Sequence, residues 1–332
     1  MYKRQAANLD DGVDEFLGGS ADEISYGKVS LRSLIFQDDI LRMVAAAAAA
    51  RAGNIKLHQM TQLKQLEMHP DKTVFMILGN KGNVIKIRQE IEANPIRLGD
   101  FETKEVQKEK WLGDIFHQDG LSKSVDETVR DRIGRTKAAV FETVSIVQDY
   151  RLASLGGLLS AFDIWEMCII QSLLNNSEVW VEISPNTLDT LESLQSLFLR
   201  LTLDSPPSTP KVAGQWDAAM LGMKYRVMKR KLCFINSLKK SDDETLAKQI
   251  YTEQVENGWP GLAAEAKEIC SVLNLPNITV SAVSQQDIDR SIKSANKDEL
   301  VKEMEKSSKL KHLVEEDFER KEYLENNYYN YR

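Results

Sequence analysis

Two adjacent carboxylates, Asp38 and Asp39, have the residue type and the setting that metal-dependent chemistry needs. They lie in the segment LIFQDDIL, where apolar residues stand on both sides. Two short strands, Val29–Phe36 and Ile40–Val44, around so brief a polar stretch are typical of a β-hairpin with both carboxylates at its turn. Carboxylate oxygens suit Mg²⁺, and paired ions of this kind promote phosphoryl transfer.

An ordinary hairpin with two exposed acids is the competing interpretation. The chain has two more acidic pairs, Asp10-Asp11 and Asp242-Asp243, and both stand among polar residues. The metal hypothesis therefore depends on the apolar flanks and not on the pair itself.

The elements that would position the hairpin form an α+β region up to residue 122. The alanine-rich stretch Ala45–Glu67 predicts a helix, because alanine loses the least entropy in one. A turn then leads to a buried strand, Thr73–Leu78, and to a helix, Val84–Glu92. Lys110–His117 predicts a strand that ends in a turn.

Helices dominate residues 123–240. Apolar spacing predicts Ser124–Asp149, Leu158–Leu174, Thr187–Leu203 and Ala218–Lys239. Ser184 and Pro185 are typical of a helix cap and a first helical position. One buried face on each helix predicts a bundle around Val140, Leu158, Trp165, Leu191, Phe198 and Leu232.

Two groups of basic residues on these helices are candidate contacts for nucleic-acid phosphates. Lys123, Arg130 and Lys137 follow one another at intervals of seven, and Arg226, Lys229 and Arg230 form a second cluster. A solvated helix face is the alternative interpretation of each group.

Composition narrows the class of protein. The 332 residues are 42% hydrophobic and 28% charged, which is typical of a globular chain. A net charge of −7 argues against a generally basic nucleic-acid binder, and most of it lies in residues 241–332. Within that region Leu300–Asn327 suits a long solvated helix.

Several kinds of site and segment are excluded by residue type. The three cysteines lie far apart, so a disulfide scaffold and a zinc knuckle are not expected. The four histidines lack metal-ligand spacing. No uncharged apolar stretch reaches the length of about 18 residues that a transmembrane helix needs.

The order of the motifs resembles a known family. LIFQDDIL resembles the aromatic-x-Asp-Asp hairpin of reverse transcriptase palms, and HPDKT at residues 69–73 resembles the palm motif that follows it. WLGDIFHQDG at residues 111–120 resembles the primer-grip hairpin. LLNNSEVW (173–180) and TLESLQSLFLRLTLDSPPSTPK (190–211) resemble the thumb of non-long-terminal-repeat (non-LTR) retrotransposon polymerases. The resemblance covers residues 6–240, and residues 241–332 match nothing specific.

The resemblance implies a role for each matching residue. Asp38 and Asp39 would be catalytic metal ligands, with Asp38 the more important. Phe36 would support the turn from below, and Gln37 would lie near the primer end, where the family more often has a small or apolar residue. Lys72 would face the nucleotide phosphates as a charge stabiliser or proton donor. Its alternative is a surface lysine at a turn.

Further residues would contact the nucleic acid. In the family, the residues at the positions of Leu112 and Gly113 position the primer strand through backbone contacts; here a plain strand is the alternative. The thumb would add Lys123, Arg130 and Lys137 to this surface. Two Mg²⁺ ions, with Mn²⁺ as a substitute, would be the cofactors. The partners would be an RNA template, a DNA primer and deoxynucleoside triphosphates, with no membrane.

The resemblance also implies a domain order. Residues 6–122 would be the C-terminal part of the palm with the primer grip, 123–240 the helical thumb, and 241–332 a helical extension. Residues 1–5, MYKRQ, resemble the translated end of a sequencing-library transposon, and a native basic N-terminus is the alternative. The family's third metal-binding aspartate, fingers and endonuclease domain lie upstream of these motifs. We therefore expect this chain alone to be inactive.

Other functions remain open at this level. A group II intron-type reverse transcriptase and maturase shares the palm motifs, and a non-catalytic nucleic-acid-binding relic is the alternative from another class. The intact parent would act inside the cell, in the cytoplasm and nucleus, as a ribonucleoprotein.

Overall fold

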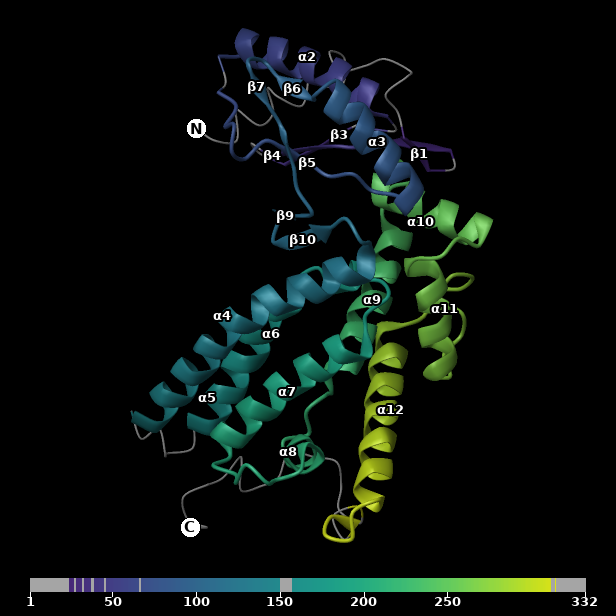
Figure 1. Ribbon diagram of the computed structural model, residues 1–332. Helices are drawn as coiled ribbons and strands as arrows, with labels where there is room; N and C mark the ends of the chain where they lie inside the picture. The colour runs from purple at the N-terminus through teal and green to yellow at the C-terminus, as the bar shows by residue number, and fades with distance from the viewer. Residues whose placement is uncertain are drawn as a thin grey trace. The chain divides into compact units, whose positions relative to one another are not determined.

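The chain is α+β and mainly helical, and it divides into two compact units (Figure 1). The computed structural model describes residues 24–26, 28–31, 33–36, 39–44, 46–65, 67–149, 157–311 and 314. Unit 1 is Met1–Ser124 and unit 2 is Val125–Arg332. The division falls two residues after the boundary at 122/123 that the sequence suggests.

The described strands of unit 1 form separate two-stranded sheets. The strands are β1 (Ile24–Tyr26), β2 (Val29–Leu31), β3 (Ser33–Phe36), β4 (Asp39–Arg42), β5 (Val74–Phe75), β6 (Arg97–Leu98), β7 (Phe101–Glu102), β8 (Lys104–Glu105), β9 (Lys108–Trp111) and β10 (Asp114–His117). Antiparallel pairs join β1 to β2, β3 to β4, β6 to β7 and β9 to β10, while β5 and β8 pair in parallel.

The prediction of one sheet built from Val29–Phe36 and Ile40–Val44 is therefore only partly confirmed. The first segment is two strands, and β2 pairs with β1 and not with β4. The predicted strand Thr73–Leu78 is reduced to Val74–Phe75, whose ladder partner is β8. Strands this short make few ladder hydrogen bonds, and the partner of β5 lies about 30 residues further along the chain.

Two helices complete unit 1: α2 (Ala47–Leu63) and α3 (Lys81–Ala93). Both were predicted, with slightly different ends. In α2, Leu57 and Met60 lie on one face and pack with Leu98 of β6 as the buried cluster among the described side chains of this unit. Asn80 caps α3 by accepting a hydrogen bond from the N–H of Asn83 at 3.0 Å, which explains why α3 starts at Lys81.

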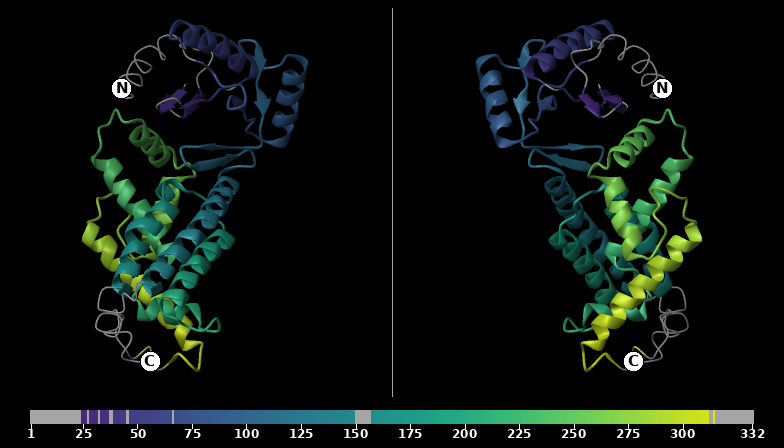
Figure 2. Two further views of the ribbon diagram at one scale, coloured as in Figure 1. Left: turned by 90° about the vertical axis from the view of Figure 1, so that its left-hand side faces the viewer. Right: turned by 90° about the vertical axis from the view of Figure 1, so that its right-hand side faces the viewer.

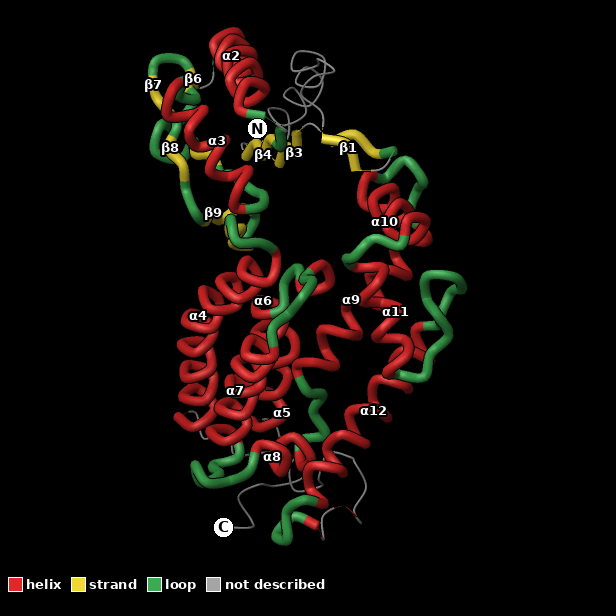
Figure 3. The backbone as a smooth tube through the Cα atoms, turned by 45° about the vertical axis from the view of Figure 1, so that its right-hand side comes forward, coloured by secondary structure: helices red, strands yellow, loops and turns green. Residues whose placement is uncertain are grey.

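Unit 2 is built from helices (Figure 3). In chain order they are α4 (Leu121–Asp149, starting in the last residues of unit 1), α5 (Gly157–Ile164), the π-helix η1 (Trp165–Ile169), α6 (Ile170–Leu173), the 3₁₀ helix η2 (Ser177–Val179), α7 (Pro185–Thr202), α8 (Lys211–Asp217), α9 (Met223–Lys240), α10 (Leu246–Asn257), α11 (Leu262–Val272) and α12 (Gln285–Glu305). The predicted cap is confirmed, because Ser184 Oγ accepts the N–H of Thr187 at 3.1 Å and Pro185 is the first residue of α7.

Large apolar side chains hold unit 2 together in more than one cluster. Val140, Trp165, Leu191 and Phe198 share the first cluster, as predicted. Leu232 instead belongs to a second cluster, formed by α9 to α12, and the side chain of Leu158 lies outside the described residues. The helix α9 contributes to both clusters, so residues 123–240 and 241–332 form one unit and not two.

The helix α12 overlaps the predicted helix Leu300–Asn327 only at residues 300–305; residues 306–311 are no longer α-helical, and 312–313 and 315–327 lie outside the described residues. It begins after Ser284, whose Oγ accepts the N–H of Asp287, and it ends at Glu305. It is not solvated on all sides, because Ile288, Ile292, Leu300 and Met304 are buried. It packs against α8 and α9 (Figure 2). The helix α8 was not predicted, because its seven residues carry too short a pattern.

Candidate functional site

The strands β3 and β4 form a hairpin at the acidic pair. Phe36 pairs with Asp39 and Ile35 pairs with Ile40, so the connecting loop is the two residues Gln37 and Asp38. Gln37 and Asp38 lie outside the described residues, as do the side chains of Phe36 and Asp39. The predicted pairing of the two strands is confirmed, but Asp39 is the first residue of β4 and not part of the turn where both carboxylates were predicted. Two consecutive carboxylates at the end of such a hairpin offer hard oxygen donors of the kind that fit Mg²⁺.

The HPDKT segment forms a tight turn around His69. Its carbonyl oxygen accepts hydrogen bonds from the N–H groups of Lys72 and Thr73, both at 3.1 Å, and from Thr73 Oγ1 at 2.9 Å. The side chain of Lys72 is exposed and makes no ion pair with any described residue. The neighbouring Asp71 is paired with Lys104 at 3.1 Å. Lys72 therefore has no ion-pair partner among the described residues, and no ladder hydrogen bond places it beside the β3–β4 hairpin.

The hairpin β9–β10 ends in a strained turn. Trp111 pairs with Asp114, which leaves Leu112 and Gly113 as the loop, and both have positive φ, at 50° and 89°. A two-residue loop with both φ positive is a type I′ turn, which costs a residue other than glycine about 1–2 kcal/mol. Leu112 is 37% exposed, so burial does not account for a leucine here. Strain of this kind is often retained at functional positions.

The predicted basic row on α4 is only partly free. Arg130 is exposed but bonds Glu127 at 3.0 Å, and Lys123 is half-buried and engaged. Lys137 is exposed and makes no ion pair with a described residue. Between them lies Gly134, where an added Cβ would meet nothing within 4 Å. One turn beyond Lys137, Phe141 is 53% exposed.

Gly134 destabilises α4, and no packing contact among the described residues requires a glycine at this position. A glycine in a helix interior costs about 1 kcal/mol relative to alanine. At Gly134 the space for a side chain is open, so contacts within the chain do not require glycine. The face from Arg130 to Phe141 therefore combines cations, bare backbone and an exposed aromatic ring.

The cations of the second basic cluster have partners within the fold. Arg226 makes a bidentate ion pair with Glu166, with both N···O distances at 2.6 Å, and Lys229 bonds Asp289 at 2.8 Å. Arg230 donates to the carbonyl oxygen of Leu174 at 3.0 Å. Burial lowers the pKa of Arg230. Each of these cations is ion-paired or hydrogen-bonded within the fold, so a phosphate would have to compete with these partners.

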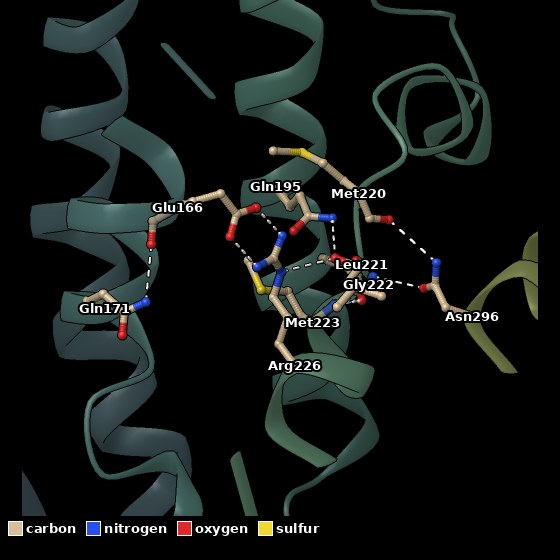
Figure 4. Close-up of polar contacts among 10 residues, drawn as sticks. Glu166, Gln171, Gln195, Met220, Leu221, Gly222, Met223, Arg226 and Asn296 are labelled. Carbon is tan, nitrogen blue, oxygen red and sulfur yellow. Dashed lines mark hydrogen bonds and ion pairs between the residues drawn. The ribbon is translucent and has the colours of Figure 1, made fainter. Parts of the chain in front are cut away.

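Arg226 belongs to a polar network that sequence reasoning missed (Figure 4). The carbonyl oxygen of Leu221 accepts from Arg226 Nε at 3.0 Å and from Gln195 Nε2 at 3.1 Å. Asn296 Oδ1 of α12 accepts the N–H of Gly222 at 2.9 Å. The segment before α9 is thereby fixed by side chains of α7, α9 and α12, and the π-helix η1 presents Glu166 to it.

A carboxylate from another helix caps α9. Glu192 of α7 accepts the N–H of Met223 and also bonds Gln215 Nε2 at 2.8 Å. Burial raises the pKa of Glu192, and the backbone hydrogen bonds from Met223 and Lys224 oppose that rise. A negative charge at a helix N-terminus is stabilising. No local pattern signals this cap, because Glu192 and Met223 are far apart in the sequence.

Arg132 of α4 has the opposite role at the end of α6. It is buried and donates to the carbonyl oxygens of Leu173 at 3.3 Å and Asn175 at 2.5 Å. Its guanidinium lies 5.5 Å from the centre of the Trp180 ring. A cation at a helix C-terminus satisfies carbonyls that have no helical partner. Arg132 therefore holds the LLNNSEVW segment against α4 and fixes which α4 residues face outward.

Comparison with known proteins yields no assignment. No family model matches the chain, and no curated protein or solved structure matches it significantly. Among the described residues, no group of three or more His, Cys, Asp or Glu could hold a metal ion. None of the helices in the described ranges is long and apolar enough to cross a membrane.

Proposed function

We propose that this chain is the C-terminal palm, primer-grip and thumb segment of an RNA-directed DNA polymerase of a non-LTR retrotransposon. The observation that carries the proposal is the β3–β4 register, which closes a two-residue turn inside LIFQDDIL. Lys72 at the HPDKT turn, with no ion-pair partner among the described residues, and the strained Leu112-Gly113 tip support it, since both lie in motifs that follow in family order. The mostly helical unit 2 is compatible with a thumb.

In this proposal the turn at Gln37 and Asp38 holds the metal-binding end of the site. Asp38 and Asp39 would bind Mg²⁺, which when bound lowers the cost of charge developing on the transferred phosphoryl group. The chain's own contribution would be the β3–β4 ladder, whose last pair is Phe36 and Asp39. Lys72 would bind the nucleotide phosphates and give a proton to the leaving pyrophosphate.

The α4 face from Arg130 to Phe141 would contact the template–primer duplex. Arg130 and Lys137 would neutralise phosphates, and the bare backbone at Gly134 would let a strand approach closely. Arg132 is a positioning residue for this face, because its bonds to the end of α6 set the rotation of α4.

Primer extension tests the catalytic part of the proposal. We expect no activity from residues 6–332 alone, and extension of a DNA primer on an RNA template once an upstream palm is restored. In that longer protein Asp38→Asn should abolish extension, and Lys72→Ala should slow it by about 10²–10⁴-fold. Asp242→Asn, in an acidic pair among polar residues, is the matched control and should leave the rate unchanged. Equal activity of the Asp38→Asn protein would refute the proposed site.

Salt-dependent binding tests the thumb. Replacing Lys123, Arg130 and Lys137 together with glutamine should weaken template–primer binding and reduce the slope of log K against log salt by up to about 0.9 per lost phosphate contact. The control replaces three exposed lysines of the C-terminal region, Lys293, Lys302 and Lys309, and removes the same charge. Equal slopes for the two variants would mean that Lys123, Arg130 and Lys137 lie on a solvated helix face and do not contact phosphates. Binding without extension in the restored protein would favour a non-catalytic binder.

A further inference from the structure

The loop between α7 and α8, residues 203–210, carries residues that the proposed function does not use. Ser205 and Thr209 each precede a proline. Pro206, Pro207 and Ser208 are exposed. A residue before proline is held in extended backbone, and proline-rich segments favour extended structure. Ser205 and Thr209 are themselves half-buried, and each is followed by an exposed proline.

The hydroxyl groups of this loop are not engaged. Neither Ser205 Oγ nor Thr209 Oγ1 makes a hydrogen bond to a described residue. Their backbone N–H groups donate to the carbonyl oxygens of Arg200 and Pro206, both at 2.9 Å. A single turn hydrogen bond thus closes the loop around Ser208, and both hydroxyls remain available to an enzyme.

The third hydroxyl–proline dipeptide of the chain, Ser184-Pro185, is different. Ser184 Oγ caps α7 and also donates to Asp126 Oδ1 at 3.0 Å. Its hydroxyl is therefore part of the folded structure and cannot be modified without breaking the cap. Sequence alone does not separate Ser184 from Ser205 and Thr209, but the structure does.

Two cations with only neutral partners stand at the ends of this loop. Arg200 Nη1 donates to the carbonyl oxygen of Pro207 at 3.1 Å, and Lys211 Nζ donates to Ser193 Oγ at 3.0 Å. Neither forms an ion pair with any residue that the structure describes. A phosphate ester between them would supply the missing counter-charge and accept charge-assisted hydrogen bonds.

We propose that the α7–α8 loop is a phosphorylation site, with Ser205 and Thr209 as acceptors for a proline-directed protein kinase and Arg200 and Lys211 as the groups that hold the phosphate. In the reaction the hydroxyl oxygen bonds to the γ-phosphorus of ATP, and the bond from that phosphorus to the β–γ bridging oxygen breaks. ADP leaves with the electron pair, and the hydroxyl proton passes to a base of the kinase. The phosphate would then link Arg200, near the end of α7, to Lys211, at the start of α8, through ionic hydrogen bonds.

Site mapping by mass spectrometry is the first test. The folded full chain is incubated with ATP and a mitogen-activated protein kinase, beside a free Ser-Pro peptide as a positive control. We expect phosphate on Ser205 and Thr209, loss of modification in Pro206→Ala and Pro210→Ala, unchanged modification in Ser208→Ala, and none on Ser184. If the control peptide is modified while Ser205 and Thr209 remain free, or if Ser184 is modified as fast as they are, the proposal fails.

Thermal unfolding of the modified protein tests the role of the two cations. Phosphorylation should raise the midpoint of the unit 2 transition by about 2–4 °C, because it creates new charge-assisted contacts. In the Arg200→Gln, Lys211→Gln variant, modified to the same extent, the rise should vanish. An equal rise in both proteins would show that Arg200 and Lys211 do not hold the phosphate.

Discussion

Unit 1 and unit 2 are held together by different means. Among the described side chains of unit 1, the buried cluster is Leu57, Met60 and Leu98, and α3 buries none of its side chains. Ion pairs fix α3 instead, from Arg51 to Glu90 at 2.6 Å and from Arg88 to Glu105 at 2.9 and 2.5 Å. In unit 2, stacked aromatic rings and whole helix faces are buried.

The candidate catalytic residues and the most stabilising contacts therefore lie in different units. Surface ion pairs contribute little each, while buried aromatic side chains contribute several kcal/mol. The candidate metal and nucleotide residues are on unit 1, whose described side chains form only a small buried cluster, and the α4 face belongs mostly to unit 2, whose described core is large. We therefore expect two separable unfolding transitions, with the one of unit 1 first.

The largest effect should follow from truncating the unit 2 core. Phe198 is fully buried, stacks on Trp165 with ring centres 4.4 Å apart, and meets Phe162 edge-on at 5.9 Å. Phe198→Ala should lower the free energy of unfolding by about 3–5 kcal/mol. Hydrogen exchange resolved by segment should place the loss in unit 2 and leave α2 unchanged. Equal loss of protection in α2 would mean that the two units unfold together.

Alkaline pH should weaken unit 2 through Tyr251. Burial raises its pKa to about 12, and its hydroxyl has no hydrogen-bond partner among the described residues. Above pH 10 the unfolded tyrosine ionises while the folded one stays neutral, so stability falls between about pH 10 and 12, by roughly 2–3 kcal/mol. Tyr251→Phe should remove this loss and cost little at pH 7, as denaturant titrations at both pH values would show. Tyr225→Phe is the contrasting variant, because it loses the bond to Glu299 at 2.6 Å and should destabilise already at pH 7.

In unit 1 the backbone at Gly99 should be the sensitive point. Gly99 has φ at +60°, and an added Cβ would lie 2.5 Å from His58 Cε1 on α2. Gly99→Ala should cost about 1–2 kcal/mol from the positive φ alone. Gly82→Ala in α3 is the matched control, since its nearest contact is 3.7 Å, and it should stabilise by up to about 1 kcal/mol. Circular dichroism in urea would compare them, and similar effects would contradict the turn geometry.

The smallest effect should come from the ion pairs that fix α3. Arg51→Gln removes the pair with Glu90 and the hydrogen bond to the carbonyl oxygen of Asn94 at 2.8 Å. We expect a loss of about 0.2–1 kcal/mol at low salt. At 1 M salt the screening length is only about 3 Å, so the difference from the parent should nearly disappear. A loss that persists at high salt would assign Arg51 a packing role instead.

Local signals predicted the elements on which the candidate site depends. The hairpin in LIFQDDIL follows from apolar flanks around a short polar tip, and the start of α7 follows from Ser184 and Pro185. Both depend on groups within a few residues of one another. The strand predicted at 73–78 is only Val74–Phe75, and the segment Val29–Phe36 is divided between two sheets, because strand pairing also depends on distant segments such as β8.

Charge alone does not reveal which cations are available. Arg226 and Lys137 look alike in the sequence, yet Arg226 is closed off by Glu166, sixty positions away, and Lys137 is exposed. The same holds for Ser184 and Ser205, each followed by proline. The sequence determined where helices, turns and reactive residue types occur, since those depend on near neighbours. Only the tertiary structure decided which of these groups are already paired, because their partners come from elements far along the chain.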